Sequence, residues 1–169
     1  MTAYDIDRER THFSVAFRPG IKGLGARVTG VEGTFEATVD DDGVVDWDRP
    51  VHGSFTMAVR DLEMGNRFLT FGARQWLDPR RFESVRGELR DVEPNGADGF
   101  TAGLQVYVKD MDVRIVGRGR FVVVERGRIT VRGTSMVDPR AFKVMTPPFL
   151  NFMVLARWTI HLTPTADPD

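Results

Sequence analysis

The side chains that could bind a metal or act as a general acid or base are scattered along this sequence. The three histidines, His12, His52 and His161, lie far apart and have no spacing typical of metal ligands. The run Asp40–Asp42 lacks the alternating ligands and distal glutamate of an EF-hand, so it is typical of a solvated turn. No serine lies in a G-x-S-x-G motif, and the chain contains no cysteine. The sequence therefore predicts no catalytic residue, no metal site and no cofactor.

Several arginines lie at alternating positions of one segment, and two more lie in the segment that follows. Arg114, Arg118 and Arg120 alternate along the first, and Arg128 and Arg132 lie in the second. Guanidinium groups match the geometry of phosphate, so this pattern could bind a phosphate head group. The other interpretation, which we favour, is the solvent-facing side of a β-hairpin with a nearby glutamate as counter-charge.

The composition is that of a globular domain with little net charge. The chain has 169 residues, of which 41% are apolar and 28% charged, and its formal net charge is −1. This balance predicts a single domain over residues 1–163 and a disordered tail at 164–169. The low net charge argues against nucleic acid as a partner, and no apolar stretch is long enough to span a bilayer. The first residues lack the apolar core of a signal peptide, which predicts a cytoplasmic location.

Alternation of apolar and polar residues dominates the chain. It is typical of antiparallel strands that bury one face. The alternating segments lie at 13–17, 31–39, 55–59, 100–108, 113–123, 129–131 and 152–162. Gly117, Gly119 and Gly133 fall inside such segments and predict bends that let a sheet curl and close. We therefore predict an all-β fold, a closed antiparallel β-barrel of about eight strands, which is large enough to hold one small ligand.

Two apolar segments break this alternation. Residues 66–77 predict one short helix that Asn66 caps, with Phe68 and Phe71 on the same face. Residues 142–152 predict an apolar loop around two consecutive prolines. We expect both segments to cover one end of the barrel, because apolar clusters of this size rarely stay bare on a monomer.

Five short motifs occur in order along nearly the whole chain. They are Tyr4–Asp7, His12–Phe17, Val31–Phe35, the segment that begins at Arg67, and Arg140–Phe142. In order and spacing they resemble the motifs Y-x-I-D, H-S-x-V-x-F, V-x-G-x-F, R-D-x-H-L and R-x-F-G of the YceI-like family. The resemblance implies a lipocalin-like barrel that binds long isoprenoid or other amphiphilic lipids in its interior.

The sequence departs from the family pattern at the expected mouth of the barrel. Phe68 and Thr70 stand where the R-D-x-H-L motif has Asp and His, and Lys143 replaces the glycine of the last motif. Polar groups at the mouth are thus largely replaced, whereas the apolar interior that the resemblance implies is retained.

The candidate ligand-binding residues are apolar side chains on the buried phase of the strands and in the two covering segments. They are Phe17, Phe35, Phe55, Met57, Phe68, Phe71, Leu104, Phe121, Met145, Phe149, Phe152 and Trp158. We predict that they bind an apolar or amphiphilic small molecule, an isoprenoid or a fatty-acid-like lipid. Two alternatives stay open: an enzyme acting on a lipid-like substrate in the same cavity, and a filled barrel that associates with a second copy as a homodimer.

Overall fold

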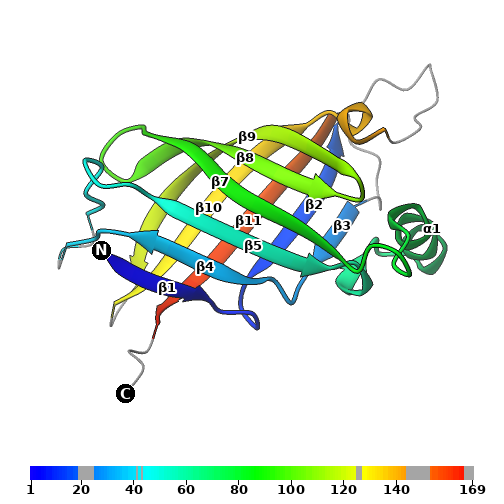
Figure 1. Cartoon of the computed structure of the whole chain (residues 1–169), viewed down its shortest axis with the longest axis horizontal. Helices are drawn as coiled ribbons and strands as arrows, with labels where there is room; N and C mark the ends of the chain where they lie inside the picture. The colour runs from blue at the N-terminus through cyan, green and yellow to red at the C-terminus, as the bar shows by residue number, and fades with distance from the viewer. Residues whose placement is uncertain (19–24, 41, 43, 125–126, 144–152, 166–169) are drawn as a thin grey trace.

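Eight antiparallel strands form a closed barrel in the computed structural model, which describes residues 1–18, 25–40, 42, 44–124, 127–143 and 153–165 (Figure 1). The strands of the ring are β1 (Thr2–Ile6), β4 (Glu32–Ala37), β5 (His52–Ala58), β7 (Ser84–Pro94), β8 (Gly99–Val108), β9 (Met111–Val124), β10 (Arg128–Val137) and β11 (Met153–Pro164). Each pairs with its neighbour in that order, and β1 also pairs with β11, which closes the ring. The predicted all-β fold and closed antiparallel barrel are confirmed.

Three further strands, β2, β3 and β6, lengthen the barrel wall at one end. β2 (His12–Arg18) pairs with Met153–Thr159 of β11, whereas β1 pairs with Leu162–Pro164 of the same strand. β1 and β2 therefore follow each other along one edge of β11. Next to β2 lies β3 (Gly25–Val28), and next to β3 lies β6 (Leu62–Glu63).

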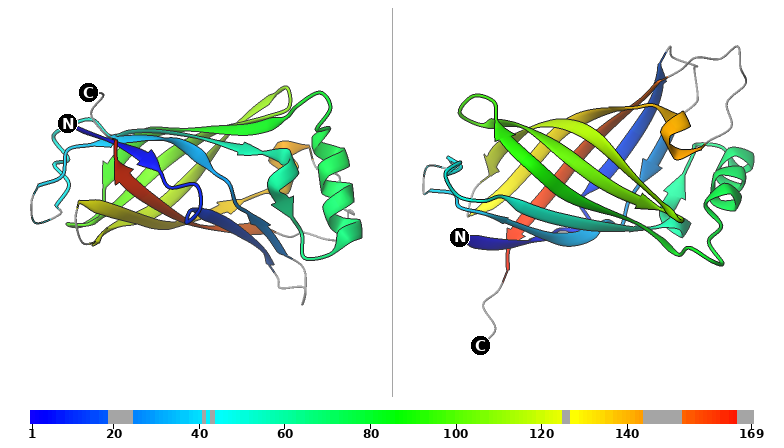
Figure 2. Two further views of the ribbon diagram at one scale, coloured as in Figure 1. Left: turned by 90° about the horizontal axis from the view of Figure 1, so that it is seen from below. Right: turned by 45° about the horizontal axis from the view of Figure 1, so that its top comes forward.

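The helix α1 (Arg67–Leu77) connects β6 to β7 and lies across this end of the barrel (Figure 2). The described strand pairings include none between β6 and β7. The side-chain oxygen of Asn66 accepts hydrogen bonds from the amides of Phe68 (2.8 Å) and Leu69 (3.4 Å), as an N-cap does. Asp78 ends the helix in a left-handed conformation. The predicted short helix is confirmed.

The sequence pattern did not predict β1 and β7. β1 buries only Tyr4, so it offers no alternation to detect. In β7 the pairing with β8 shifts register between Arg90 and Glu93, and Asp91 has a positive φ of 45°. Such an irregularity bends a strand and breaks its period of two, which hides the strand from a search for strict alternation.

The last strand reaches into the segment assigned to a tail from the sequence. Pro164 pairs with Tyr4 in β1, and the amide of Thr165 donates a hydrogen bond to the carbonyl of Ala3 (2.9 Å). The chain is therefore attached to the barrel up to residue 165, and 166–169 lie outside the described residues.

The barrel interior is packed differently along its length. At the end away from α1, the rings of Phe100 and Phe121 lie 5.0 Å apart, and Trp47 from the connection between β4 and β5 lies 5.7 Å from Phe121. Trp47 packs against a buried cluster that fills this end: Tyr4, Phe35, Ala37, Val45, Phe100, Ala102, Phe121, Ile129, Val131 and Leu162. Near α1 a smaller cluster consists of Val59, Leu77, Val106 and Val108.

Candidate functional site: the barrel cavity

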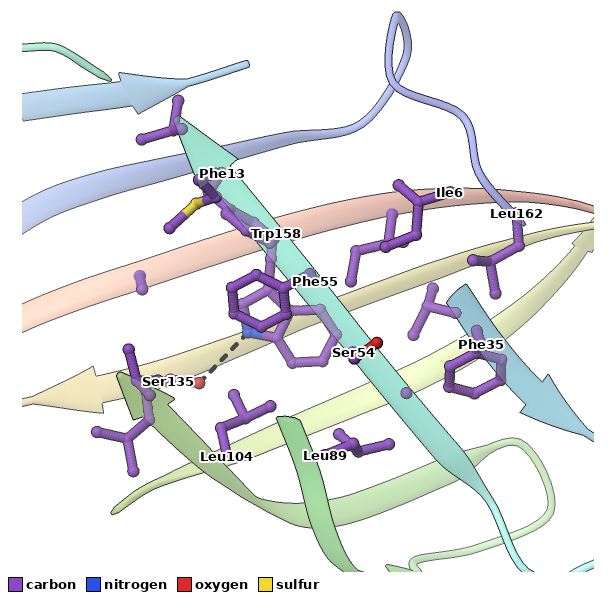
Figure 3. Close-up of a pocket in the computed structure, with 18 of the residues that line it drawn as sticks. Ile6, Phe13, Phe35, Ser54, Phe55, Leu89, Leu104, Ser135, Trp158 and Leu162 are labelled. Atoms are coloured by element: carbon purple, nitrogen blue, oxygen red, sulfur yellow. Dashed lines mark hydrogen bonds between the residues drawn. The ribbon is translucent and has the colours of Figure 1, made fainter. Parts of the chain in front are cut away.

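A cavity of about 210 Å³ lies between the two clusters, inside the barrel (Figure 3). Each of the eight ring strands contributes to its wall. The lining residues are Ile6, Phe13, Val15, Val28, Thr34, Phe35, Gly53, Ser54, Phe55, Met57, Leu89, Phe100, Leu104, Val106, Ile115, Val131, Ser135, Ala156, Trp158, Ile160 and Leu162. None of these residues is charged, and the polar ones are three hydroxyl residues. The wall therefore favours contact with hydrocarbon over contact with an ion.

Four of the five described aromatic residues that line the cavity lie opposite a glycine on a neighbouring strand; the fifth, Phe13, lies between Val28 and Trp158. The directly paired residues are Phe35 with Gly53, Phe55 with Gly87, Phe100 with Gly119, and Trp158 with Gly133. A Cβ on Gly87 would collide with the outer edge of the Phe55 ring. The missing side chain thus leaves room for the ring to lie against the wall. Aromatic rings packed over cross-strand glycines are a known device for stabilising sheets, and here they also keep the centre of the barrel open.

Trp158 has glycines of two strands against its indole ring. A Cβ on Gly119 would lie 2.6 Å from its indole ring, and one on Gly133 would lie closer still. Its Nε1 donates a hydrogen bond to Oγ of Ser135 (3.3 Å; Figure 3). The sequence analysis interpreted Gly117, Gly119 and Gly133 as bends, whereas the structure shows that they form a notch for this indole.

Five of the sequence-predicted site residues line the cavity. They are Phe35, Phe55, Met57, Leu104 and Trp158. Phe121 is buried at the filled end instead, where its ring packs against Phe35 and Trp47. The side chain of Phe17 and all of Met145, Phe149 and Phe152 lie outside the described residues. Their contact with a ligand stays a prediction.

Phe68 and Phe71 lie on the outer side of α1, away from the cavity. Their side chains are 87% and 66% exposed. The inner side of α1 is anchored by Trp76 and Leu77, which pack in the smaller cluster. Lys109 adds to this anchor, because its Nζ donates to the carbonyl of Trp76 (2.9 Å) and lies 5.2 Å from the indole centroid. A part for Phe68 and Phe71 in ligand binding stays a prediction.

Sequence reasoning missed several residues of the cavity wall. Ile6 and Leu89 belong to the two strands that gave no clear alternation. Ile160 and Leu162 share the phase of Trp158 in β11, so extending the site along that strand would have found them. Leu89 had no comparable signal, because the register shift in β7 lies close to it.

The interior presents little acid–base chemistry. Tyr4 is buried at the filled end, and this burial raises the pKa of its phenol, so the side chain stays neutral at ordinary pH. His161 lies on the outer phase of β11, where Nδ1 is 3.1 Å from Oγ1 of Thr130. Within the described residues, no group of three or more His, Asp or Glu side chains could hold a metal ion. The site thus provides shape and apolar surface.

Comparison with solved structures identifies the fold. BcnA of Burkholderia cenocepacia superposes with a TM-score of 0.75 and 11% identity, over 94% of this chain and 99% of that one. A mutant of the Campylobacter jejuni YceI protein gives a TM-score of 0.66 and 9% identity, over 84% of this chain and 85% of that one. The unmodified Campylobacter jejuni YceI protein gives 0.57 and 10%, over 79% and 82%. The fold is YceI-like.

The YceI-like fold confirms what the short sequence motifs indicated. No model of a known protein family matches the sequence, and no curated protein does. At the family's R-D-x-H-L position, Thr70 replaces His, and its Oγ1 accepts a hydrogen bond from the amide of Met64 (2.9 Å). This residue therefore helps to fix the start of α1. None of the helices in the described part of the chain is long and apolar enough to cross a membrane.

Proposed function

We propose that this YceI-like barrel binds an apolar or amphiphilic lipid, isoprenoid or fatty-acid-like, in its interior. The observation that carries the proposal is the cavity to which eight strands contribute and whose described lining residues include no charged side chain. Hydrocarbon inside such a cavity leaves water without leaving any buried charge unpaired. The fold shared with the Campylobacter jejuni YceI protein is consistent with this proposal.

The size of the cavity is sufficient for useful affinity. An apolar cavity of roughly 150 Å³ stays free of water and is large enough to bind benzene. The cavity here has about 210 Å³, so it accommodates a branched or cyclic hydrocarbon group. Burial contributes roughly 25 cal/mol per Å² of apolar surface, so a few hundred Å² contributes several kcal/mol. Micromolar affinity remains after the cost of ordering the ligand.

The arrangement supports binding over the two alternatives. An enzyme acting on a lipid-like substrate needs a nucleophile or a general base at the reacting atom. The polar residues of the wall are Thr34, Ser54 and Ser135. Thr34 and Ser54 are exposed, and the buried Ser135 already accepts the hydrogen bond of Trp158. Among the described lining residues, none is a titratable partner that could activate a hydroxyl. A filled barrel that serves only for self-association would need no cavity between its two clusters.

Filling the cavity tests the proposal directly. Ala156 lines the cavity, and Ala156→Phe places a ring in the space that the lipid would occupy. Ala141 is exposed on the short helix η2 (Pro139–Phe142), so Ala141→Phe adds the same ring outside the barrel. We expect A156F to weaken binding of a dansyl-farnesyl probe at least tenfold, and A141F to leave it within twofold. Circular dichroism checks that both variants fold.

The unmodified protein is also extracted with organic solvent after native purification, and the extract is examined by mass spectrometry. A co-purified lipid that A156F lacks supports the proposal. If the unmodified protein takes up neither prenyl nor fatty-acid probes, or if A156F and A141F bind them equally, lipid binding in the interior is ruled out.

We further propose that Phe68 and Phe71 contact the lipid during uptake. Both are exposed on α1, whose inner residues share the smaller apolar cluster with Leu104 and Ile115 of the cavity wall. The double variant F68S/F71S is expected to slow probe association about fivefold in stopped-flow fluorescence. The control V116S/V122S removes exposed apolar residues from β9. Equal rates in the two variants would show that α1 has no part in uptake.

A further inference from the structure

The outer surface of β9, β10 and β11 carries four exposed arginines around a groove. They are Arg118 and Arg120 on β9, Arg132 on β10 and Arg157 on β11. We call the groove that they line the arginine groove. The groove has a volume of about 690 Å³, and Asn95, Thr134 and Thr159 also line it. It lies on the opposite side of the barrel wall from the lipid cavity, since the residues of these strands alternate between the two faces.

Strand register brings the guanidinium groups together. Arg120 lies directly opposite Arg132, and Thr134 lies between Arg118 and Arg157 on its two neighbouring strands. Directly opposite side chains have Cβ atoms about 5 Å apart, and strands two apart are separated by roughly 10 Å. Like charges placed directly opposite destabilise a sheet. The fold therefore tolerates an arrangement that its own stability does not favour.

Acidic neighbours balance this charge only in part: among the described lining residues of the groove the one carboxylate is that of Asp98. Asp98 accepts a hydrogen bond from Nη2 of Arg120 (2.8 Å), whereas none of the ion pairs found in the described part of the chain involves Arg118, Arg132 or Arg157. Some arginines elsewhere on the surface are paired with an acid, as Arg114 is with Asp91 (2.5 Å). The whole chain has nearly equal numbers of acidic and basic residues, 24 against 23. The excess of positive charge is thus local.

We propose that the arginine groove binds an anion that carries two or more negative charges on phosphate groups. Guanidinium groups form bidentate hydrogen bonds with phosphate oxygens, and several forks at this spacing reach the same ligand. The hydroxyls of Thr134 and Thr159 and the amide of Asn95 provide further hydrogen bonds at the groove. This chemistry is shared by free pyrophosphate and by the phosphomonoester head group of a lipid. The site does not depend on the function proposed for the cavity.

Binding of inorganic pyrophosphate provides the first test. We expect isothermal titration calorimetry to show submillimolar affinity at about 20 mM salt, which falls at least tenfold at about 500 mM salt. The variant R118Q/R132Q is expected to bind at least tenfold more weakly. R60Q/R80Q is the matched control, because both residues are exposed near α1 and removing them changes the net charge equally. The control should stay within twofold of the unmodified protein.

A second measurement distinguishes the two sources of phosphate. Phosphatidylcholine vesicles with and without phosphatidic acid are sedimented with the protein, in the presence and absence of pyrophosphate. Binding only to the vesicles with phosphatidic acid, displaced by pyrophosphate and lost in R118Q/R132Q, identifies a lipid head group. Pyrophosphate binding without vesicle binding identifies a free anion. Equal losses in R118Q/R132Q and R60Q/R80Q, or no pyrophosphate binding at 10 mM, would overturn the site.

Discussion

The two faces of β9, β10 and β11 have opposite chemistries, although successive residues of the same strands form both of them. The inner face carries Gly119, Gly133 and Trp158, which meet in a dry apolar contact beside the cavity. One residue away in each strand, Arg120, Arg132 and Arg157 face the outer groove. The inner face is held by shape, because each glycine leaves room for one ring. The outer face is governed by charge, because its side chains repel one another and are exposed to solvent.

This difference indicates how each face responds to substitution. An added methyl group inside collides with a ring that lies against the glycine, so the ring must leave its position on the barrel wall. A substitution on the outer face meets solvent, so its main effects are on charge and hydrogen bonding. Substitutions on the inner face should therefore have the larger effects on stability, and those on the outer face the smaller ones.

The largest effect is expected for Gly133→Val, which places a side chain in the space that the Trp158 indole occupies. We expect the free energy of unfolding to fall by about 3 kcal/mol, a typical cost of overpacking. Urea unfolding followed by circular dichroism measures it. The control repeats the substitution in a W158L background, where the collision with the indole is relieved and only the close approach to the Arg118 carbonyl remains, so G133V should cost less. An equal loss in both backgrounds would show that the indole is not the cause.

A smaller loss is expected for Ser135→Ala, which removes the acceptor of the Trp158 Nε1 hydrogen bond. The buried N–H group loses its partner, so stability should fall by about 1 kcal/mol. For a domain of this size that lowers Tm by roughly 2–4 °C in a calorimetric scan. Ser54→Ala serves as the control, since Ser54 lies at the same cavity and is an exposed residue. Similar losses in the two variants would argue against a role for the hydrogen bond.

On the outer face, Arg132→Thr is expected to stabilise the barrel, because it removes the like charge opposite Arg120. The gain should be about 0.2–1 kcal/mol at low salt and should vanish at about 500 mM salt. Arg157→Thr is the matched control, because Arg157 lies opposite Ser14 and Thr134. Denaturant midpoints measure both variants. A gain for R157T as large as that for R132T would remove repulsion between Arg120 and Arg132 as the explanation.

The smallest effect concerns pH and His161. Burial, together with the positive charge of Arg10, lowers the pKa of this imidazole below its ordinary value of 6.5. The unfolded chain therefore takes up the proton more readily than the folded chain does. The stabilising contribution is present above the ordinary pKa and is lost as pH falls through the lowered pKa.

Tm is thus expected to fall slightly between pH 7.5 and pH 5.5. In His161→Gln part of that fall should disappear, whereas His52→Gln, at an exposed position, should retain it. Scanning calorimetry at the two pH values makes the comparison. An unchanged pH dependence in H161Q would show that other groups cause it.

Alternation was sufficient to predict the barrel, and capping chemistry was sufficient to predict α1. Phe35, Phe55 and Trp158 could be placed at the cavity because each shares the phase of its strand with other apolar residues. Leu89 could not, since the irregularity in β7 hides its phase. The glycine that lies opposite each of these aromatic residues could not be predicted from the sequence either. That Gly133 lies opposite Trp158 depends on the register of two strands, and a single sequence does not specify register.

Prediction of the arginine groove was limited in the same way, because its residues come together only through the pairing of strands. The alternation of Arg118 and Arg120 and the presence of Arg132 in the next segment were visible in the sequence. The sequence analysis favoured the solvent-facing side of a β-hairpin with a nearby glutamate as counter-charge, and the structure shows that Arg118, Arg120 and Arg132 are exposed on the paired strands β9 and β10. Arg157 joins the group from β11, a distant part of the chain, and only the pairing of β10 with β11 brings it there.

The shared edge of β11 has a consequence for how this barrel assembles. β10 pairs with one edge of this strand, and both β1 and β2 pair with the other. Strands from the first and last parts of the sequence must therefore meet before the ring closes, and contacts at such separations slow folding. Until β11 arrives, the edges of β1, β2 and β10 have unpaired backbone groups. During synthesis this interval is the one in which edge-to-edge association with other chains is most favourable.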